Sequence, residues 1–295
     1  MSVAYITHAD LVRFADERVN LKREDAAELR DQVWRLRKRL ENYLTEHPDF
    51  ELRKMLLSGS LAKGTALKSL NDIDVACYVS SDRAPTESGE LAHFLADRLR
   101  SAFPNFQPDQ VKPNKYSVAV SFAGTGLTVD VVPIVYDGDA EWYGHLVSRD
   151  TGEKLRTSIP RHLEFIRKRK DNPDFAQIVR LMKFWVKGVK ERDQQFRFKS
   201  FMIELIVAHL ADEGLDLEDY PTALGRIFAY IAADHLKTAI AFADYYSPAA
   251  CKISSDMIRI WDPVNPDNNV AKLYTVVDVA AIMEHARDWQ EVFDV

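Results

Sequence analysis

The chain has 295 residues, a hydrophobic fraction of 46% and a formal net charge of −6, which indicates one large globular domain or two intimate ones. An acidic chain has no overall basic footprint, so any nucleic-acid binding must use a local patch. The two cysteines, Cys77 and Cys251, exclude a disulfide framework and suggest no zinc site. No apolar run reaches a membrane span and the N-terminus lacks a signal-peptide core, so we expect a cytoplasmic protein outside the membrane.

Two helices are predicted before the first strand. Residues 8 to 20 form a short helix, and residues 23 to 46 form a long one that ends before Pro48. The apolar stripe of the long helix consists of Leu29, Val33, Leu36, Leu40 and Leu44. Its remaining surface is rich in bases: Arg30, Arg35, Arg37, Lys38 and Arg39. This basic face is either a solvated surface or a patch that contacts the backbone of a nucleic acid or an acidic partner.

Residues 55 to 79 carry the strongest signal. An apolar run leads into Ser58-Gly59-Ser60, and Asn71-Asp72-Ile73-Asp74 then opens a second apolar run. The pattern predicts a strand, a glycine turn, a short helix and a second strand that begins with two carboxylates. Asp72 and Asp74 project to the same face, roughly 7 Å apart, which suits hard divalent cations. Gly59 lets the backbone approach a phosphate, so the stretch indicates phosphoryl transfer by two metal ions.

The rest of the chain supplies another acid and a helical half. A helix is expected over residues 91 to 103, then an antiparallel hairpin over residues 111 to 136 that turns at Gly124-Thr125-Gly126. The second hairpin strand contains Asp130, which is either a buried acid with a partner or metal, or a cap near Pro133. Helical spacing follows at 160–170, 174–192, 198–213, 221–243 and 277–292, with one short strand pattern at 257–261.

The motif of residues 55 to 79 resembles the nucleotidyltransferase superfamily that includes DNA polymerase beta. The resemblance implies an α/β (α+β) core with a mixed sheet over residues 1–160, a helical nucleotide-binding domain over 161–295, and an active site in the cleft between them. The third metal carboxylate of the superfamily lies on a neighbouring strand, which Asp130 matches. Asp72, Asp74 and Asp130 are therefore implied to be catalytic ligands of two Mg²⁺ ions, with Mn²⁺ as an alternative.

Further runs are similar to oligoadenylate synthetases. GSLAKGTALKSLNDIDV matches their first motif, and IVRLMKFW resembles the helix that carries a triphosphate-binding lysine, here Lys183, with Arg180 on the same face. FKSFMIEL resembles the next helix, whose first polar residue, here Ser200, contacts the triphosphate. Gly59 and Ser60 are implied to cradle that triphosphate as well. Alternatively, Lys183 extends to solvent and Ser200 merely begins a helix. The Asp262–Asn269 loop also resembles the family, although its Pro and Asn residues favour a structural role.

The chain also resembles the bacterial cGAS/DncV-like nucleotidyltransferases (CD-NTases) of CBASS anti-phage systems. SGSLAKGTAL, SLNDIDVA, KSFMIEL and DPVNPDNNVA resemble the branch associated with HORMA-domain proteins. This implies that the protein makes a cyclic oligonucleotide messenger from ATP and releases pyrophosphate. Cyclic triadenylate is the first choice of product. It also implies a HORMA-domain activator, with double-stranded nucleic acid on the basic face as a second input. The alternatives are a linear RNA nucleotidyltransferase of the CCA-adding or oligoadenylate type, and an inactive scaffold.

Overall fold

The computed structural model describes residues 6–47, 51–70, 72–80, 85, 90–233 and 235–293, so Pro48 and Asn71 lie outside the described residues. The chain divides into two compact units. One is Leu21–Glu164, and the other combines the chain up to Asn20 with the chain from Phe165 onward. We call them the sheet unit and the helical unit. The N-terminal helix, expected from the sequence to belong to a core of residues 1–160, lies by its contacts in the helical unit.

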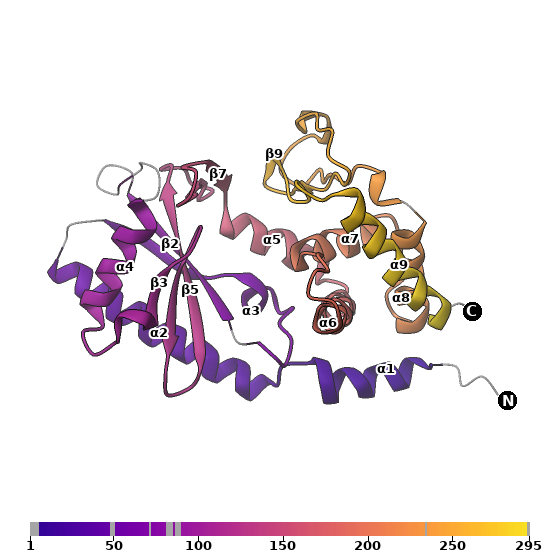
Figure 1. The fold of residues 1–295 in the computed structure, drawn as a ribbon, viewed down its shortest axis with the longest axis horizontal. Helices are drawn as coiled ribbons and strands as arrows, with labels where there is room; N and C mark the ends of the chain where they lie inside the picture. Colours follow the sequence, from indigo (N-terminus) through magenta and orange to yellow (C-terminus); the bar gives the residue numbers. More distant parts are fainter. Residues whose placement is uncertain are drawn as a thin grey trace. The chain divides into compact units, whose positions relative to one another are not determined.

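The described strands of the sheet unit form one mixed sheet in the order β1-β2-β5-β4-β3, with β6 paired to β5 and β7 to β6 (Figure 1). Of these pairs β2 and β5 run parallel, and the others are antiparallel. The predicted mixed sheet is therefore confirmed, although the sequence analysis missed β6 and β7. The strands are β1 Leu52–Leu57, β2 Asp72–Ser80, β3 Val111–Pro113, β4 Val118–Phe122, β5 Leu127–Tyr136, β6 Gly144–Val147 and β7 Lys154–Thr157.

Two helices, α2 (Arg23–Glu46) and α4 (Glu90–Ala102), share the main core with one face of the sheet. Alternate residues of β2, from Ile73 to Val79, enter this core because successive strand side chains point to opposite faces. The apolar stripe predicted for α2 is there as well: Val33, Leu36, Leu40 and Leu44 are buried, and Leu29 packs against them. The other face carries a smaller cluster around Ala76, Tyr78 and Ile134.

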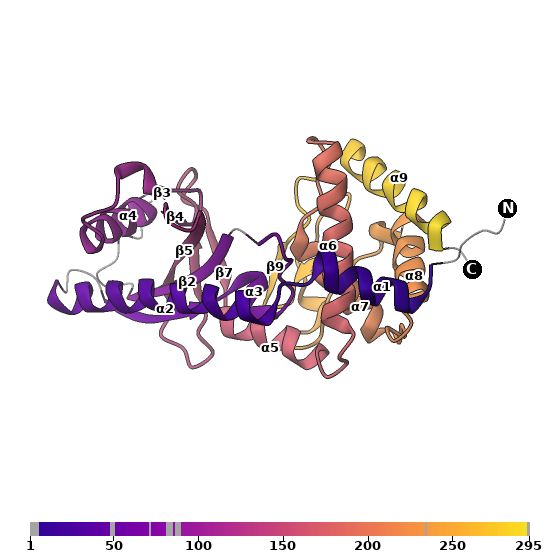
Figure 2. The same ribbon diagram turned by 90° about the horizontal axis from the view of Figure 1, so that it is seen from below.

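The helical unit holds the N-terminal helix and the C-terminal helices (Figure 2). Helix α1 (His8–Phe14) runs into a π-helical turn at Ala15–Val19, and α5 (Ile159–Arg169) passes from the sheet unit into the helical unit. The ring of Phe14 meets that of Phe184 edge-on at 5.3 Å. The remaining helices are α6 Phe175–Arg192, α7 Ser200–Asp212, α8 Tyr220–Ala232 and α9 Val276–Phe293. Short 3-10 turns lie at Pro108–Gln110, His235–Lys237 and Pro248–Ala250.

Two sequence predictions for the helical unit were wrong in detail. Helix α8 ends at Ala232 rather than at residue 243, because Ile240 bonds to the backbone of Arg259 and Trp261 instead. The predicted strand at 257–261 is shifted: β8 (Trp261–Asp262) pairs with β9 (Asn265–Asn269), while Ile260 only bridges to Ile240. None of the helices in the described part of the chain combines the length and hydropathy that a bilayer span requires.

Candidate active site

Three predicted carboxylates share one face of the sheet. The parallel register of β2 and β5 places Asp74 beside Asp130, and Asp72 beside Thr128. Ile73 and Val75 enter the main core, so Asp72 and Asp74 project from the opposite face of β2. Asp130 lies across from Asp74 and projects to that same face. The fold therefore brings together acids that lie far apart in the sequence.

The carboxylates of Asp72, Asp74 and Asp130 concentrate negative charge on this face of the sheet. Partial burial raises the pKa of Asp72, and the nearby charge of Asp130 raises it further. The Oδ1 atom of Asp130 accepts hydrogen bonds from Ser117 Oγ at 3.0 Å and from Asn114 Nδ2 at 3.3 Å. These bonds orient the Asp130 side chain. In the described chain, no three His, Cys, Asp or Glu side chains converge closely enough to form a metal cluster.

The turn after β1 is locked against Asp74. The amide of Ser58 donates to the carbonyl of Asp74 at 2.8 Å. Gly59, the first residue of α3 (Gly59–Lys63), has a φ of +62°, and a Cβ built there would lie 1.8 Å from Asp74 Oδ2. Only glycine fits both the backbone conformation and the contact. Ser60 follows it and is partly exposed, and its carbonyl accepts from the amide of Thr65 at 2.9 Å.

Lys183, predicted to bind a triphosphate, is buried in the helical unit. It lies on α6, is 6% exposed, and forms an ion pair with Glu204 of α7, which is 2% exposed. The ammonium group thus does not extend to solvent. Glu204 was not among the residues predicted from the sequence. The available signal was a single acid in the apolar run FMIELIV, together with a lysine flanked by apolar residues in the run LMKFW of α6.

The other two predicted residues of the helical unit differ in exposure. Arg180 donates to Asn20 Oδ1 at 2.8 Å and to Gln177 Oε1 at 2.6 Å, and burial lowers the pKa of its guanidinium. Arg180 therefore ties the end of the N-terminal segment to α6. Ser200 is exposed and begins α7, where amides that lack helical partners favour an anion.

The Asp262–Asn269 loop is bonded to itself. Asp262 is 4% exposed, and its carboxylate accepts from the amide of Val264 at 3.0 Å and from Asn268 Nδ2 at 3.1 Å. Asn269 Oδ1 accepts from the amides of Ile260 and Ala271, each at 3.0 Å. These bonds support the structural interpretation of the loop that its Pro and Asn residues favoured.

The basic face predicted on α2 is smaller than its composition indicates. Arg39 donates to the carbonyl of Ala102 at 2.6 Å and lies over the ring of Phe103, so it fastens α2 to the end of α4. Arg37 pairs with Glu41 at 2.7 Å. The three other bases, Arg30, Arg35 and Lys38, are exposed, and the amino group of Lys38 lies 5.4 Å from the centre of the exposed Trp34 ring.

Comparisons with known proteins identify the family of the chain. Residues 6–168 match the Second Messenger Oligonucleotide or Dinucleotide Synthetase domain. The chain belongs to this synthetase family. It is 52% identical to the "Cyclic AMP-AMP-AMP synthase" of Escherichia coli strain MS 115-1, over the whole chain and 92% of that protein. It is 31% identical to the "CBASS oligonucleotide cyclase CdnC" of E. coli strain KTE188, over 90% of this chain and 84% of that protein.

Solved structures extend the family assignment. The E. coli MS115-1 CdnC structure with ATP has a TM-score of 0.90 and 52% identity, and covers 99% of this chain and 92% of that chain. The complex of E. coli MS115-1 CdnC with a HORMA protein has a TM-score of 0.89 and 51% identity. The match covers 98% of this chain and 91% of that chain. CdnG of Bradyrhizobium diazoefficiens shares the fold, with a TM-score of 0.70 and 12% identity. The match covers 97% of this chain and 91% of that chain. The nucleotidyltransferase fold and the second-messenger synthetase activity predicted from the sequence are thus confirmed.

Proposed function

We propose that this synthetase joins ATP into a cyclic oligoadenylate, with cyclic triadenylate as the principal product, and releases pyrophosphate during cytoplasmic anti-phage defence. The observation that carries the proposal is the set of three carboxylates on one face of β2 and β5, locked against Gly59. The specific product is supported by 52% identity, along the whole chain, to a synthase named for cyclic AMP-AMP-AMP.

Asp72, Asp74 and Asp130 are the residues that would hold two Mg²⁺ ions. The donor set fits, because carboxylate oxygens are the ligands that Mg²⁺ prefers. Burial, and then the charge of Asp130, raise the pKa of Asp72, so a cation at this face would be favourable. When bound, the ions supply Lewis acidity and neutralise negative charge on the reacting phosphates. Ser117 and Asn114 hold the Asp130 carboxylate in one orientation.

Other residues of the chain would bind the donor triphosphate. Gly59 lets the backbone come close to the phosphates, and the Ser60 hydroxyl follows it. Ser200 would add a hydroxyl and the exposed N-terminus of α7. Lys183 would contribute its positive charge from α6, where Glu204 fixes its ammonium group. The bonds of Arg180 to Asn20 and Gln177 favour a supporting role for that residue.

Regulation would come from a protein and from nucleic acid. A relative of 51% identity forms a complex with a HORMA protein, which supports a HORMA-domain activator for this chain. Double-stranded nucleic acid would contact Arg30 and Lys38 on α2 as an assisting input.

Product analysis tests the proposal. The purified chain is incubated with the four NTPs and Mg²⁺, with and without the HORMA-domain protein of E. coli MS115-1. A product that resists phosphatase, contains only adenylate and has the mass of a cyclic trimer is expected, and EDTA abolishes it while added Mn²⁺ restores it. Extension of an added RNA primer would instead support the linear polymerase, and absence of turnover under every condition would support a scaffold.

A further inference from the structure

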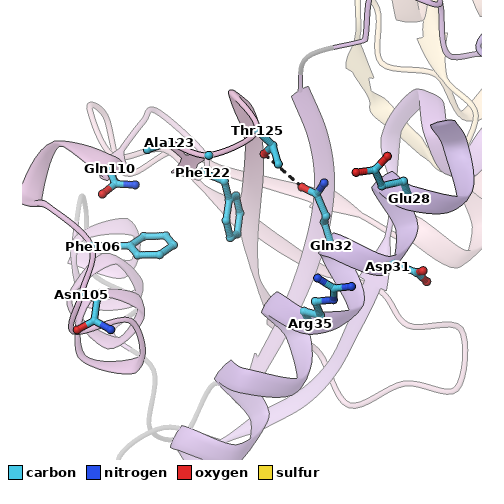
Figure 3. A pocket seen from close by; sticks show the side chains of 11 residues that line it. Glu28, Asp31, Gln32, Arg35, Asn105, Phe106, Gln110, Phe122, Ala123 and Thr125 are labelled. Carbon is cyan, nitrogen blue, oxygen red and sulfur yellow. Dashed lines mark hydrogen bonds between the residues drawn. The ribbon is translucent and has the colours of Figure 1, made fainter.

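A pocket of about 740 Å³ opens on the sheet unit, on the α4 side of α2 (Figure 3). Helix α2 forms one wall, the segment between α4 and β3 forms another, and the β4–β5 turn closes the third side. This volume lies within the range that accommodates small ligands or a few side chains of a partner. The pocket is separate from the carboxylates, which project from the opposite face of the sheet.

The floor of the pocket is aromatic. Phe106 and Phe122 meet edge-on with ring centroids 5.5 Å apart, and Phe106 also contacts Phe103 at 4.9 Å. Phe103 is buried in the main core, whereas Phe106 and Phe122 are partly exposed. An apolar side chain placed on these two rings would extend the core outward.

The walls are held in place before any ligand arrives. Gln110 donates to the carbonyl of Ser121 at 2.8 Å, and its Oε1 accepts from the amide of Gln107 at 2.9 Å. The Thr125 hydroxyl donates to Gln32 Oε1 at 3.5 Å, as the dashed line in Figure 3 shows. A pre-formed pocket loses less entropy on binding.

The rim contributed by α2 is charged and unneutralised. Glu28, Asp31, Gln32 and Arg35 have the spacing i, i+3, i+4 and i+7, so they line one side of the helix. The side chains of Glu28, Asp31 and Arg35 have no hydrogen-bond or ion-pair partner among the described residues. Among the α2 residues that line the pocket, two carboxylates and one guanidinium leave one net negative charge.

We infer that the pocket is the docking site for a segment of the protein activator, one that presents an apolar side chain next to a lysine or arginine. The aromatic floor receives the apolar side chain, and the carboxylates of Glu28 and Asp31 pair with the base. These carboxylates repel phosphates, which disfavours nucleic acid here.

This inference rests on the protein activator of the proposed function. It adds a path to the catalytic strand, because Leu36 and Leu40 on the inner side of α2 share a core with Val75 and Cys77 of β2. A partner that holds α2 therefore contacts the helix that supports the strand carrying Asp72 and Asp74.

The test measures binding of the HORMA-domain protein of E. coli MS115-1 by calorimetry. One variant reverses the rim charge, Glu28→Lys with Asp31→Lys, and a second fills the pocket with Ala123→Trp at the exposed turn. The control is Glu213→Lys with Glu218→Lys, which makes the same change of net charge on exposed residues of the helical unit. We expect each pocket variant to weaken binding at least tenfold and the control to bind like the parent chain.

The outcomes separate this inference from the proposed function. Binding within twofold of the parent by both pocket variants, at unchanged melting temperature, would overturn the docking site, and so would a parent chain that does not bind this protein. Binding of AMP or of a DNA duplex to the parent but not to the Ala123→Trp variant, with no effect on the binding of the HORMA-domain protein, would overturn it as well. Basal synthesis of cyclic product by both pocket variants is expected, and its absence from the parent chain counts against the proposed function alone.

Discussion

At the scale of single residues, the contact between Gly59 and Asp74 is the most restrictive feature of the site. In Gly59→Ala the new Cβ must push the Asp74 carboxylate aside, so we expect a loss of activity of about a hundredfold or more. Gly138→Ala is the matched control: its φ is +86° and no atom lies within 4 Å of the added Cβ. Both variants lose about 1 kcal/mol of unfolding free energy from the strained backbone. Equal activity of the two variants would contradict the contact.

The carboxylates themselves allow a sharper separation of activity from stability. Asp72→Asn and Asp74→Asn should each lower product formation by about a thousandfold, since several kcal/mol of transition-state stabilisation depend on the metal ligands. The pKa of Asp72 is raised in the folded state, so its charge opposes folding once the pH exceeds the unfolded value. Asp72→Asn should therefore unfold at an equal or higher denaturant concentration than the parent at pH 7. If Asp72→Asn were strongly destabilised and still had normal turnover, Asp72 would be neither a metal ligand nor a charge that opposes folding.

At the scale of elements, the buried ion pair between α6 and α7 decides how Lys183 can be tested. Lys183→Ala leaves Glu204 as an unpaired buried charge, which should lower the unfolding free energy by about 3–5 kcal/mol. The double variant Lys183→Met with Glu204→Leu removes both charges and should be much more stable than either single variant. Triphosphate binding is then measured on the double variant, where a raised KM for ATP reports the missing lysine. Additive losses in denaturant unfolding would show that the pair is not coupled.

The start of α8 supplies a pH-dependent prediction. Asp219 is its N-cap and accepts from the amide of Thr222 at 3.2 Å, and the hydrogen bond from Thr222 lowers the pKa of Asp219. Because the folded pKa is depressed, this contribution is present above the unfolded pKa and is lost as the pH falls through the folded one. Asp219→Ala should cost about 1 kcal/mol at pH 7 and progressively less below about pH 4. Asn can still cap the helix, so Asp219→Asn should lose less unfolding free energy than Asp219→Ala. An equal loss in the two variants would contradict the role of Asp219 as N-cap.

The elements also show what the sequence could and could not predict. Helix α2 and strand β5 were predictable from their periodicity and β2 from its apolar run, and the two acids of β2 share a face because side chains alternate along a strand. Strands β6 and β7 have four residues each, too short for a period to emerge. Ser117 and Glu204 were missed because each acts on a partner that only tertiary packing brings near. Arg39 looked like surface charge because composition cannot reveal its bond to Ala102.

At the scale of the whole molecule, a net charge of −6 makes any response to nucleic acid depend on a small patch. If duplex DNA or RNA stimulates synthesis through α2, the ratio of stimulated to basal rate should fall steeply between 50 and 200 mM salt, since phosphate contacts release counterions. Arg30→Glu with Lys38→Glu should abolish the stimulation. Arg37→Glu is the comparison, because Arg37 already pairs with Glu41. An unchanged ratio in the double variant would place the sensor elsewhere.

The position of β5 in the chain affects how the sheet can form during synthesis on the ribosome. Strand β2 pairs with β1 on one side and with β5 on the other, but β5 is synthesised only after α4, β3 and β4. Until Tyr136 has emerged, the nascent chain presents the apolar edge of β2 without its partner, which is a template for pairing with other chains. The acids at the start of β2 repel an identical strand stacked in register. The negative charges of Asp72 and Asp74, which are proposed to serve catalysis, would therefore also reduce aggregation of the incomplete sheet.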